Sequence, residues 1–96
     1  MMSHNGMSIG DALRIYLRKS PLKPRLDEYR IQEKWEEVMG KTIARYTSSL
    51  LLRGGRLIIT TNVAPLKQEL SYSKEKIKQL LNEAIGEPVV QEVVVQ

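Results

Sequence analysis

Four basic side chains between residues 41 and 56 are the groups in this sequence best suited to bind an anion. Lys41, Arg45, Arg53 and Arg56 lie in a stretch that contains no Asp or Glu. An arginine can hold a phosphate through two parallel hydrogen bonds, and such contacts grip a nucleic-acid backbone without reading its bases. We therefore predict a nucleic-acid-binding surface here, with a solvated charged face as the equally weighted alternative.

A second basic set points to a protein partner. Lys67, Lys74 and Lys78 fall on the side of an expected helix that faces away from its leucine stripe. We interpret these lysines as a partner-binding face. Ordinary solvent exposure is again the alternative.

Residues that could do catalysis are scarce. The chain has no cysteine, and its one histidine, His4, lies in a polar tail, so thiolate, multi-histidine and triad chemistry are excluded. The adjacent acids Asp27-Glu28 and Glu36-Glu37 fall within an expected helix, where neighbouring side chains point about 100° apart. We expect a binding module rather than an enzyme, with no metal, cofactor or small-molecule substrate.

Size and charge set the class of protein. The chain has 96 residues, a net charge of +4 and a pI near 9.5. It shows neither an apolar run of the ~20 residues needed to cross a bilayer nor a signal peptide. We expect a cytoplasmic protein with no membrane partner. Residues 1–7 are expected to form a disordered tail, and residues 8–96 a single domain.

The first half of the domain is expected to be helical. Ser8 and Asp11 resemble a capping box at the start of a first helix, whose apolar stripe contains Ile9, Leu13, Tyr16 and Leu17. Pro21 and Pro24 should end it and form a short basic linker. A second helix is expected over about 26–39, with Trp35 on its apolar stripe as a core residue, followed by a short helical piece over 41–46.

The second half predicts a hairpin, a long helix and a last strand. Gly54-Gly55 suits a two-residue type I′ turn between strands 50–53 and 56–61, which places Leu52 opposite Leu57 and Arg53 opposite Arg56. Because like charges placed opposite each other repel, an anion bridging the two arginines would be favourable. Asn62 should cap one helix over 63–85, and a strand of eight residues, VVQEVVVQ, should follow Pro88. The expected class is α+β, with three strands and the helices on one face.

The spacing of several residues resembles the DciA family, a bacterial family formerly known only as a domain of unknown function. The resemblance covers about residues 26–96 and rests on the segments WEEVMGKTIARYT, LRGGRLIITTNVAPLKQEL and IKQLLNEAIGEPVVQEVVV. The residues that carry it are Trp35, Gly40, Ala44, Thr47, Gly55, Leu57, Ile59, Glu69, Leu70, Leu81, Asn82 and Gly86.

The resemblance implies a KH-like fold and a function in DNA replication. A member of this family is expected to bind DNA, with single strands as one candidate form, and the replicative helicase, and to promote helicase loading or operation. Two other readings stay open: a KH-like RNA-binding protein, and a protein-interaction adaptor that does not bind nucleic acid.

Overall fold

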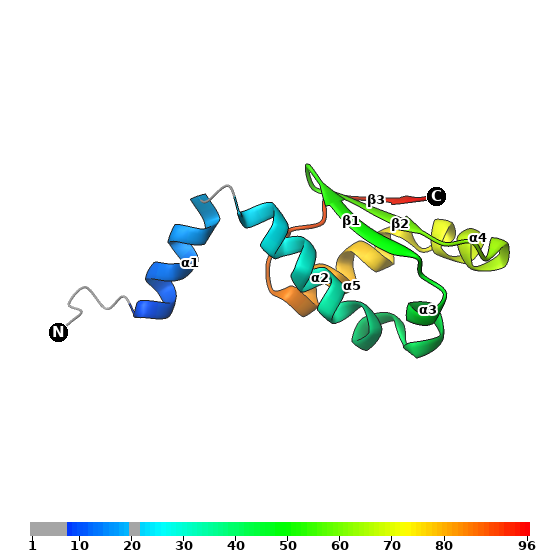
Figure 1. Ribbon diagram of the computed structural model, residues 1–96, viewed down its shortest axis with the longest axis horizontal. Helices are drawn as coiled ribbons and strands as arrows, with labels where there is room; N and C mark the ends of the chain where they lie inside the picture. Colours follow the sequence, from blue (N-terminus) through cyan, green and yellow to red (C-terminus); the bar gives the residue numbers. More distant parts are fainter. Residues whose placement is uncertain (1–7, 20–21) are drawn as a thin grey trace.

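The computed structural model describes residues 8–19 and 22–96, and the side chains of 14 and 16–19 are outside that description. The tail expected over residues 1–7 therefore lies outside the described residues. The chain runs in the order α1 (Ile9–Lys19), α2 (Lys23–Met39), α3 (Lys41–Arg45), β1 (Ser49–Arg53), β2 (Arg56–Thr60), α4 (Ala64–Tyr72), α5 (Lys74–Ile85) and β3 (Glu92–Val95) (Figure 1).

The first helix has the expected start, and the described residues of its apolar stripe are exposed. The Asp11 N–H donates to Ser8 Oγ at 3.0 Å and the Ser8 N–H to Asp11 Oδ2 at 3.4 Å, which is the reciprocal pattern of a capping box. On its apolar stripe, Ile9 is 81% and Leu13 55% exposed. Helix α1 lies beyond the start of α2 and away from the sheet (Figure 1). The side chains of Tyr16 and Leu17 are outside the described residues.

The second helix begins three residues earlier than we predicted, at Lys23 rather than Leu26. Pro24 lies in the first turn of this helix, where backbone N–H groups have no intrahelical acceptor, so a proline without an N–H is tolerated. Pro24 is therefore not part of a linker. Pro21 is outside the described residues. Helix α2 ends at Gly40, which has a φ of 93° and donates its N–H to Glu36 O at 2.8 Å.

The hairpin has the predicted register. Leu52 pairs with Leu57 and Arg53 with Arg56, and the two glycines of the turn have φ values of 57° and 81°. Strand β3 then pairs with β2 in the parallel sense, so the sheet is mixed, with the order β1-β2-β3. The last strand is shorter than the eight residues expected, because the chain bends at Gln91, whose N–H donates to Gly55 O at 2.8 Å.

The single helix predicted over 63–85 is wrong, because the chain breaks it at Ser73. Ser73 has a φ of −111° and a ψ of 17°, and its N–H donates to Leu70 O, three residues back. Serine competes with helical hydrogen bonding through its own side chain, as Ser71 Oγ does here by donating to Lys67 O at 2.8 Å. Two serines in three residues thus favour a break between α4 and α5.

The helix cap after β2 is also not the predicted one. Asn62 does not cap α4. The N-cap residue of α4 is Val63, whose side chain makes no capping hydrogen bond. Thr61 stabilises the entry instead. Its Oγ1 accepts the Val63 N–H at 3.2 Å and donates to Tyr46 O at 2.6 Å, which ties the start of α4 to the end of α3. Pro65 lies in the first turn, as expected.

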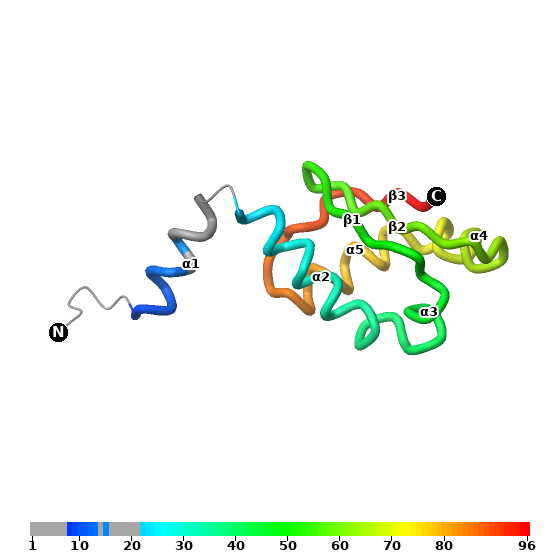
Figure 2. The backbone as a smooth tube through the Cα atoms, viewed as in Figure 1, coloured from blue at the N-terminus to red at the C-terminus, as the bar shows by residue number. Residues whose placement is uncertain are grey.

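The helices cover one face of the sheet. The buried residues of β1 and β2 alternate along each strand, and α2 and α5 pack on the face that carries them (Figure 1, Figure 2). The core consists of Ile31, Trp35, Leu50, Leu52, Leu57, Ile59, Leu70, Ile77, Leu81, Val90 and Val93. The predicted α+β class with a three-stranded sheet is confirmed, and the arrangement is compatible with a KH-like fold.

Candidate nucleic-acid interface

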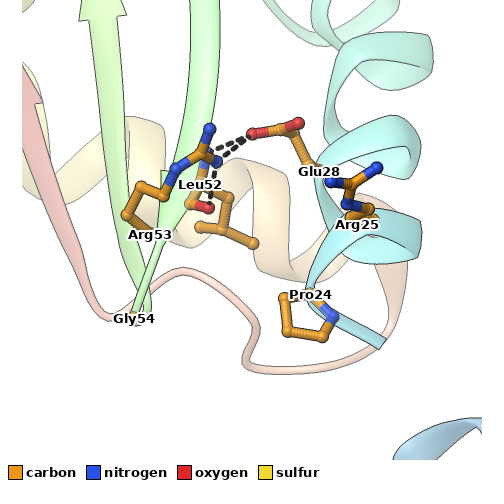
Figure 3. A pocket seen from close by; sticks show the side chains of 6 residues that line it. All are labelled: Pro24, Arg25, Glu28, Leu52, Arg53 and Gly54. Atoms are coloured by element: carbon orange, nitrogen blue, oxygen red, sulfur yellow. Dashed lines mark hydrogen bonds and ion pairs between the residues drawn. The ribbon is translucent and has the colours of Figure 1, made fainter. Parts of the chain in front are cut away.

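The Arg53 side chain is held against helix α2 at the tip of the hairpin. Its Nη1 donates to Glu28 Oε2 at 2.7 Å and to the carbonyl oxygen of Leu52 at 2.9 Å (Figure 3). The same carboxylate oxygen accepts the Leu52 N–H at 2.8 Å. Arg53 thus has a carboxylate partner 25 positions away in sequence, which the hairpin pattern alone could not reveal.

A shallow cleft lies where the hairpin meets the first turn of α2. Its volume is about 460 Å³, and Figure 3 shows the side chains around it: Pro24, Arg25, Glu28, Leu52, Arg53 and Gly54. The Leu52 N–H lowers the pKa of Glu28 most; burial opposes the shift, and Arg53 and Arg25 support it. With two guanidiniums beside one ionised carboxylate, the cleft has a net positive charge.

Arg56 lies on the opposite strand and has a different acid partner. Its Nε donates to Glu92 Oε1 at 3.2 Å, on the neighbouring β3. Both side chains are largely exposed, 62% for Arg56 and 58% for Glu92. An exposed ion pair of this kind contributes only ~0–1 kcal/mol, so water or another anion can replace the carboxylate at small cost.

The structure separates the four predicted residues into two pairs. Lys41 and Arg45 lie four residues apart on α3 and are exposed, and neither has a carboxylate partner in the described part of the chain. Helix α3 lies at the opposite end of β1 from the hairpin tip (Figure 1). Because four residue steps of a strand span ~13 Å, the two pairs do not form a single cluster.

The lysines predicted to face a protein partner lie on two helices instead of one. Lys67 is on α4, whereas Lys74 and Lys78 are on α5, beyond the break at Ser73. Lys67 and Lys74 are exposed, and Lys78 Nζ lies 3.8 Å from Glu75 Oε1. Only Lys74 and Lys78, four residues apart on α5, lie on one helical face.

An ion-pair cluster that we did not predict joins the start of α2 to the turn that follows α5. Lys23 Nζ lies 3.3 Å from Glu87 Oε1, and Arg30 Nη1 lies 3.1 Å from Glu87 Oε2. Both cations also pair with the buried Asp27. Arg30 further donates to Ile85 O at 3.1 Å, at the end of α5. The sequence does contain one signal for this cluster. Pro24 indicates that a helix starts here, and Lys23 and Asp27, four residues apart, then lie on the same face of that helix.

Neither a metal-binding cluster nor a membrane-spanning helix is present among the described residues. In this part of the chain no group of three His, Cys, Asp or Glu side chains could hold a metal ion. No helix there is long and apolar enough to pass through a bilayer.

One comparison with known proteins identifies the family. The family model described as "Dna[CI] antecedent, DciA" matches residues 8–95. The chain belongs to the DciA family. This family is associated with loading of the replicative helicase and is of a non-catalytic type. The predicted resemblance is confirmed, and it extends further towards the N-terminus than expected. Neither a curated protein nor a solved structure gives a match.

Several of the DciA pattern residues of this chain support its fold. Trp35 donates from Nε1 to Thr47 Oγ1 at 3.0 Å, which joins α2 to the segment before β1. Gly86 ends α5 in the left-handed conformation, with a φ of 85°. Leu57, Ile59, Leu70 and Leu81 are core residues. None of the four basic residues predicted to bind nucleic acid is among the pattern residues, so the family signature by itself does not locate a binding surface.

Proposed function

We propose that this chain is a non-enzymatic accessory protein of DNA replication that binds DNA through its phosphate backbone and contacts the replicative helicase, promoting its loading or operation in the cytoplasm. The observation that carries the proposal is the DciA family match over residues 8–95. The basic side chains described above supply a physical route for DNA binding.

The arrangement of the cations favours an extended strand over a compact anion. Arg53 and Arg56 lie at one end of β1, and Lys41 and Arg45 at the other. Strand β1 itself spans ~13 Å, the length of about four stacked nucleotides at 3.4 Å each. A nucleic-acid strand lying along β1 could therefore contact both pairs, whereas a free phosphate could reach only one of them.

Each hairpin arginine would exchange its carboxylate for a phosphate on binding. Arg53 is 63% and Arg56 62% exposed on the side chain, so both guanidiniums remain open to solvent. An arginine prefers the bidentate geometry that a phosphate offers, and the Arg56–Glu92 pair that would be replaced is exposed and weak. Such contacts read no bases, so binding should be nearly independent of sequence.

The test is the salt dependence of single-strand binding. If all four cations neutralise one phosphate each, the log–log slope should be roughly −3. Changing Arg53 and Arg56 together to Gln should reduce that slope by about 1 to 1.5. Changing Lys67 and Lys74 together to Gln removes the same charge from other elements and serves as the matched control. An unchanged slope in the folded Arg53/Arg56 double variant would assign these arginines to solvent.

The helicase contact has its own test. Reversing Lys67, Lys74 and Lys78 to Glu should weaken binding of purified replicative helicase more than tenfold while leaving the DNA slope nearly unchanged. A decrease below twofold would contradict a role for these lysines. Binding of helicase with no binding of any nucleic acid would support the adaptor alternative.

The RNA-binding alternative has one observation against it. KH domains clamp the nucleic-acid backbone with a Gly-x-x-Gly loop, and no two glycines of this sequence are three positions apart. Equal affinity for DNA and RNA strands of the same sequence and length would fit backbone binding. A strong preference for RNA would favour the alternative.

A further inference from the structure

The two edges of the sheet differ in how their backbone groups are satisfied. In β1, the groups that point away from β2 belong to Leu50 and Leu52. The Leu50 carbonyl accepts from Gln32 Nε2 at 3.1 Å, the Leu52 N–H donates to Glu28, and the Leu52 carbonyl accepts from Arg53. Side chains therefore occupy this edge, as expected for a protein that avoids unwanted strand pairing.

The outward backbone groups of β3 have no such side-chain partners among the described residues. The Glu92 N–H donates to Gly55 O, the Gln96 N–H donates to Ile59 O, and Gln96 O accepts from the Thr61 N–H. Because backbone groups alternate along a strand, the N–H and C=O of Val93 and Val95 point away from β2. Among the described residues, none bonds to those four groups. From Glu92 to Gln96 the strand also has no Lys or Pro, the residues that commonly block an edge.

We propose that this edge pairs antiparallel with β3 of a second copy of the chain, which joins the two sheets into one of six strands. Only Val93 and Val95 have outward backbone groups, so the register with the most hydrogen bonds pairs Val93 with Val95 of the other copy, and Val95 with its Val93. That register gives four bonds, whereas pairing Val93 with its own counterpart gives two.

Side chains support the same register. It places Val94 opposite Val94 across the two-fold axis, and Glu92 opposite the neutral Gln96. On each copy, Val94 continues an apolar row with Ile58 and Leu51 across the solvent face of the sheet. Leu51 is 36% exposed, and Ile58 and Val94 are partly exposed. Pairing would make the two rows continuous, and it would bring no like-charged side chains face to face.

A single-cysteine variant tests the register directly. The chain has no cysteine, so Val94→Cys introduces the only thiol. In the proposed pairing the two Val94 Cα atoms would lie ~4.5 Å apart, within the range for a disulfide. Leu51→Cys lies on the same face but in β1, and five strand spacings put its counterpart ~24 Å away. We expect Val94→Cys to form a disulfide dimer under mild oxidation and Leu51→Cys to remain monomeric. Equal cross-linking of the two variants would overturn the proposal.

Sedimentation of the cysteine-free chain provides an independent measurement. The wild type should show concentration-dependent dimers. Gln96→Glu, which places a carboxylate opposite Glu92 of the other copy, should weaken the dimer several-fold, and Gln96→Lys should strengthen it. Val95→Pro removes an outward N–H without touching the bonds to β2 and should leave a folded monomer by circular dichroism. A wild type that remains monomeric at every concentration would refute the pairing, as would the same dimer constant in both Gln96 variants.

Discussion

Asn82 and Val90 exchange two hydrogen bonds across the turn that leads from α5 into β3. Asn82 Nδ2 donates to Val90 O, and the Val90 N–H donates to Asn82 Oδ1, both at 2.9 Å. A side-chain amide thus pairs with the backbone as a neighbouring strand would. The pairing also fixes the buried Val90 side chain beneath the sheet. This accounts for an asparagine near the helix end in the family pattern.

Changing Asn82 should destabilise the domain. Asn82→Ala removes both bonds and leaves a part-buried N–H and C=O without a partner, at a cost of about 1–3 kcal/mol. Asn82→Asp should cost at least as much at neutral pH, because a carboxylate oxygen would face the Val90 carbonyl. Urea unfolding measures both. Gln79→Ala, at an exposed position of the same helix, should stay within ~0.5 kcal/mol of wild type. Equal midpoints for Asn82→Ala and Gln79→Ala would contradict this role.

Trp35 is predicted to be structural rather than a stacking surface for bases. It is 3% exposed and lies in the core cluster. Trp35→Ala should cost roughly 3–5 kcal/mol, as truncations of large aromatic core residues do. Trp35→Phe keeps most of the ring contact but loses the hydrogen bond to Thr47, which should lower the free energy of unfolding by about 1 kcal/mol. Thermal melting distinguishes the two. A Trp35→Ala variant that melts like the wild type but loses nucleic-acid binding would assign Trp35 to stacking.

Acid should weaken the contacts that join α2 to the rest of the domain. The Leu52 N–H holds the pKa of Glu28 below its ordinary value of 4.5. Burial tends to raise the pKa of Glu87, but hydrogen bonds from Arg30 and Lys23 hold it below 4.5 as well. A carboxyl whose pKa is lower in the folded state adds stability above its unfolded pKa, and that stability disappears as the pH falls through the folded value.

The pH dependence can be measured as the free energy of unfolding between pH 7 and pH 3. The wild type should lose stability below about pH 4.5, and Glu28→Gln should show a shallower decrease because one contributing carboxyl is gone. Glu69→Gln, at an exposed position on α4, is the matched control and should follow the wild-type curve. If the free energy of unfolding of Glu28→Gln falls with pH as steeply as that of the wild type, the contact between Glu28 and Leu52 does not contribute to the loss of stability in acid.

The sequence predicted the parts of the fold that depend on neighbouring residues. Alternation in β1 and β2, together with Gly54-Gly55, fixes the register, and the Ser8–Asp11 cap lies within one helical turn. The break at Ser73 was missed because the leucine spacing runs through it, and serine is only a weak helix breaker. The contact between Glu28 and Arg53 has no local signal, because only the packing of α2 beside β1 brings the two together.

The same reasoning explains why the four basic residues predicted to bind nucleic acid do not form one cluster. A run of residues without acids between 41 and 56 reads as one basic block in sequence. In the fold, β1 extends through that run and carries its two ends apart, while acids from α2 and β3 come next to the arginines. Charge in sequence therefore predicted which residues are basic and exposed, but not which of them lie together.

The two glycines of the hairpin should not tolerate substitution equally. Gly54 has a φ of 57°, and a Cβ built there meets no atom within 4 Å. Gly55 has a φ of 81°, and its Cβ would lie 3.0 Å from Gln91 Cδ. The Gly55 carbonyl also accepts the N–H groups of Gln91 and Glu92, so a shift there would disturb the entry into β3.

Asparagine at each position makes a matched pair, because asparagine tolerates a left-handed conformation better than most residues. Gly54→Asn should stay within ~0.5 kcal/mol of wild type, since Asn-Gly is a preferred type I′ turn. Gly55→Asn should cost about 1–2 kcal/mol from strain at its positive φ, with the contact to Gln91 adding to it. Adding Gln91→Ala should recover only the contact part of that loss. Equal unfolding midpoints for the two asparagine variants would show that neither the φ of Gly55 nor the contact with Gln91 restricts this position.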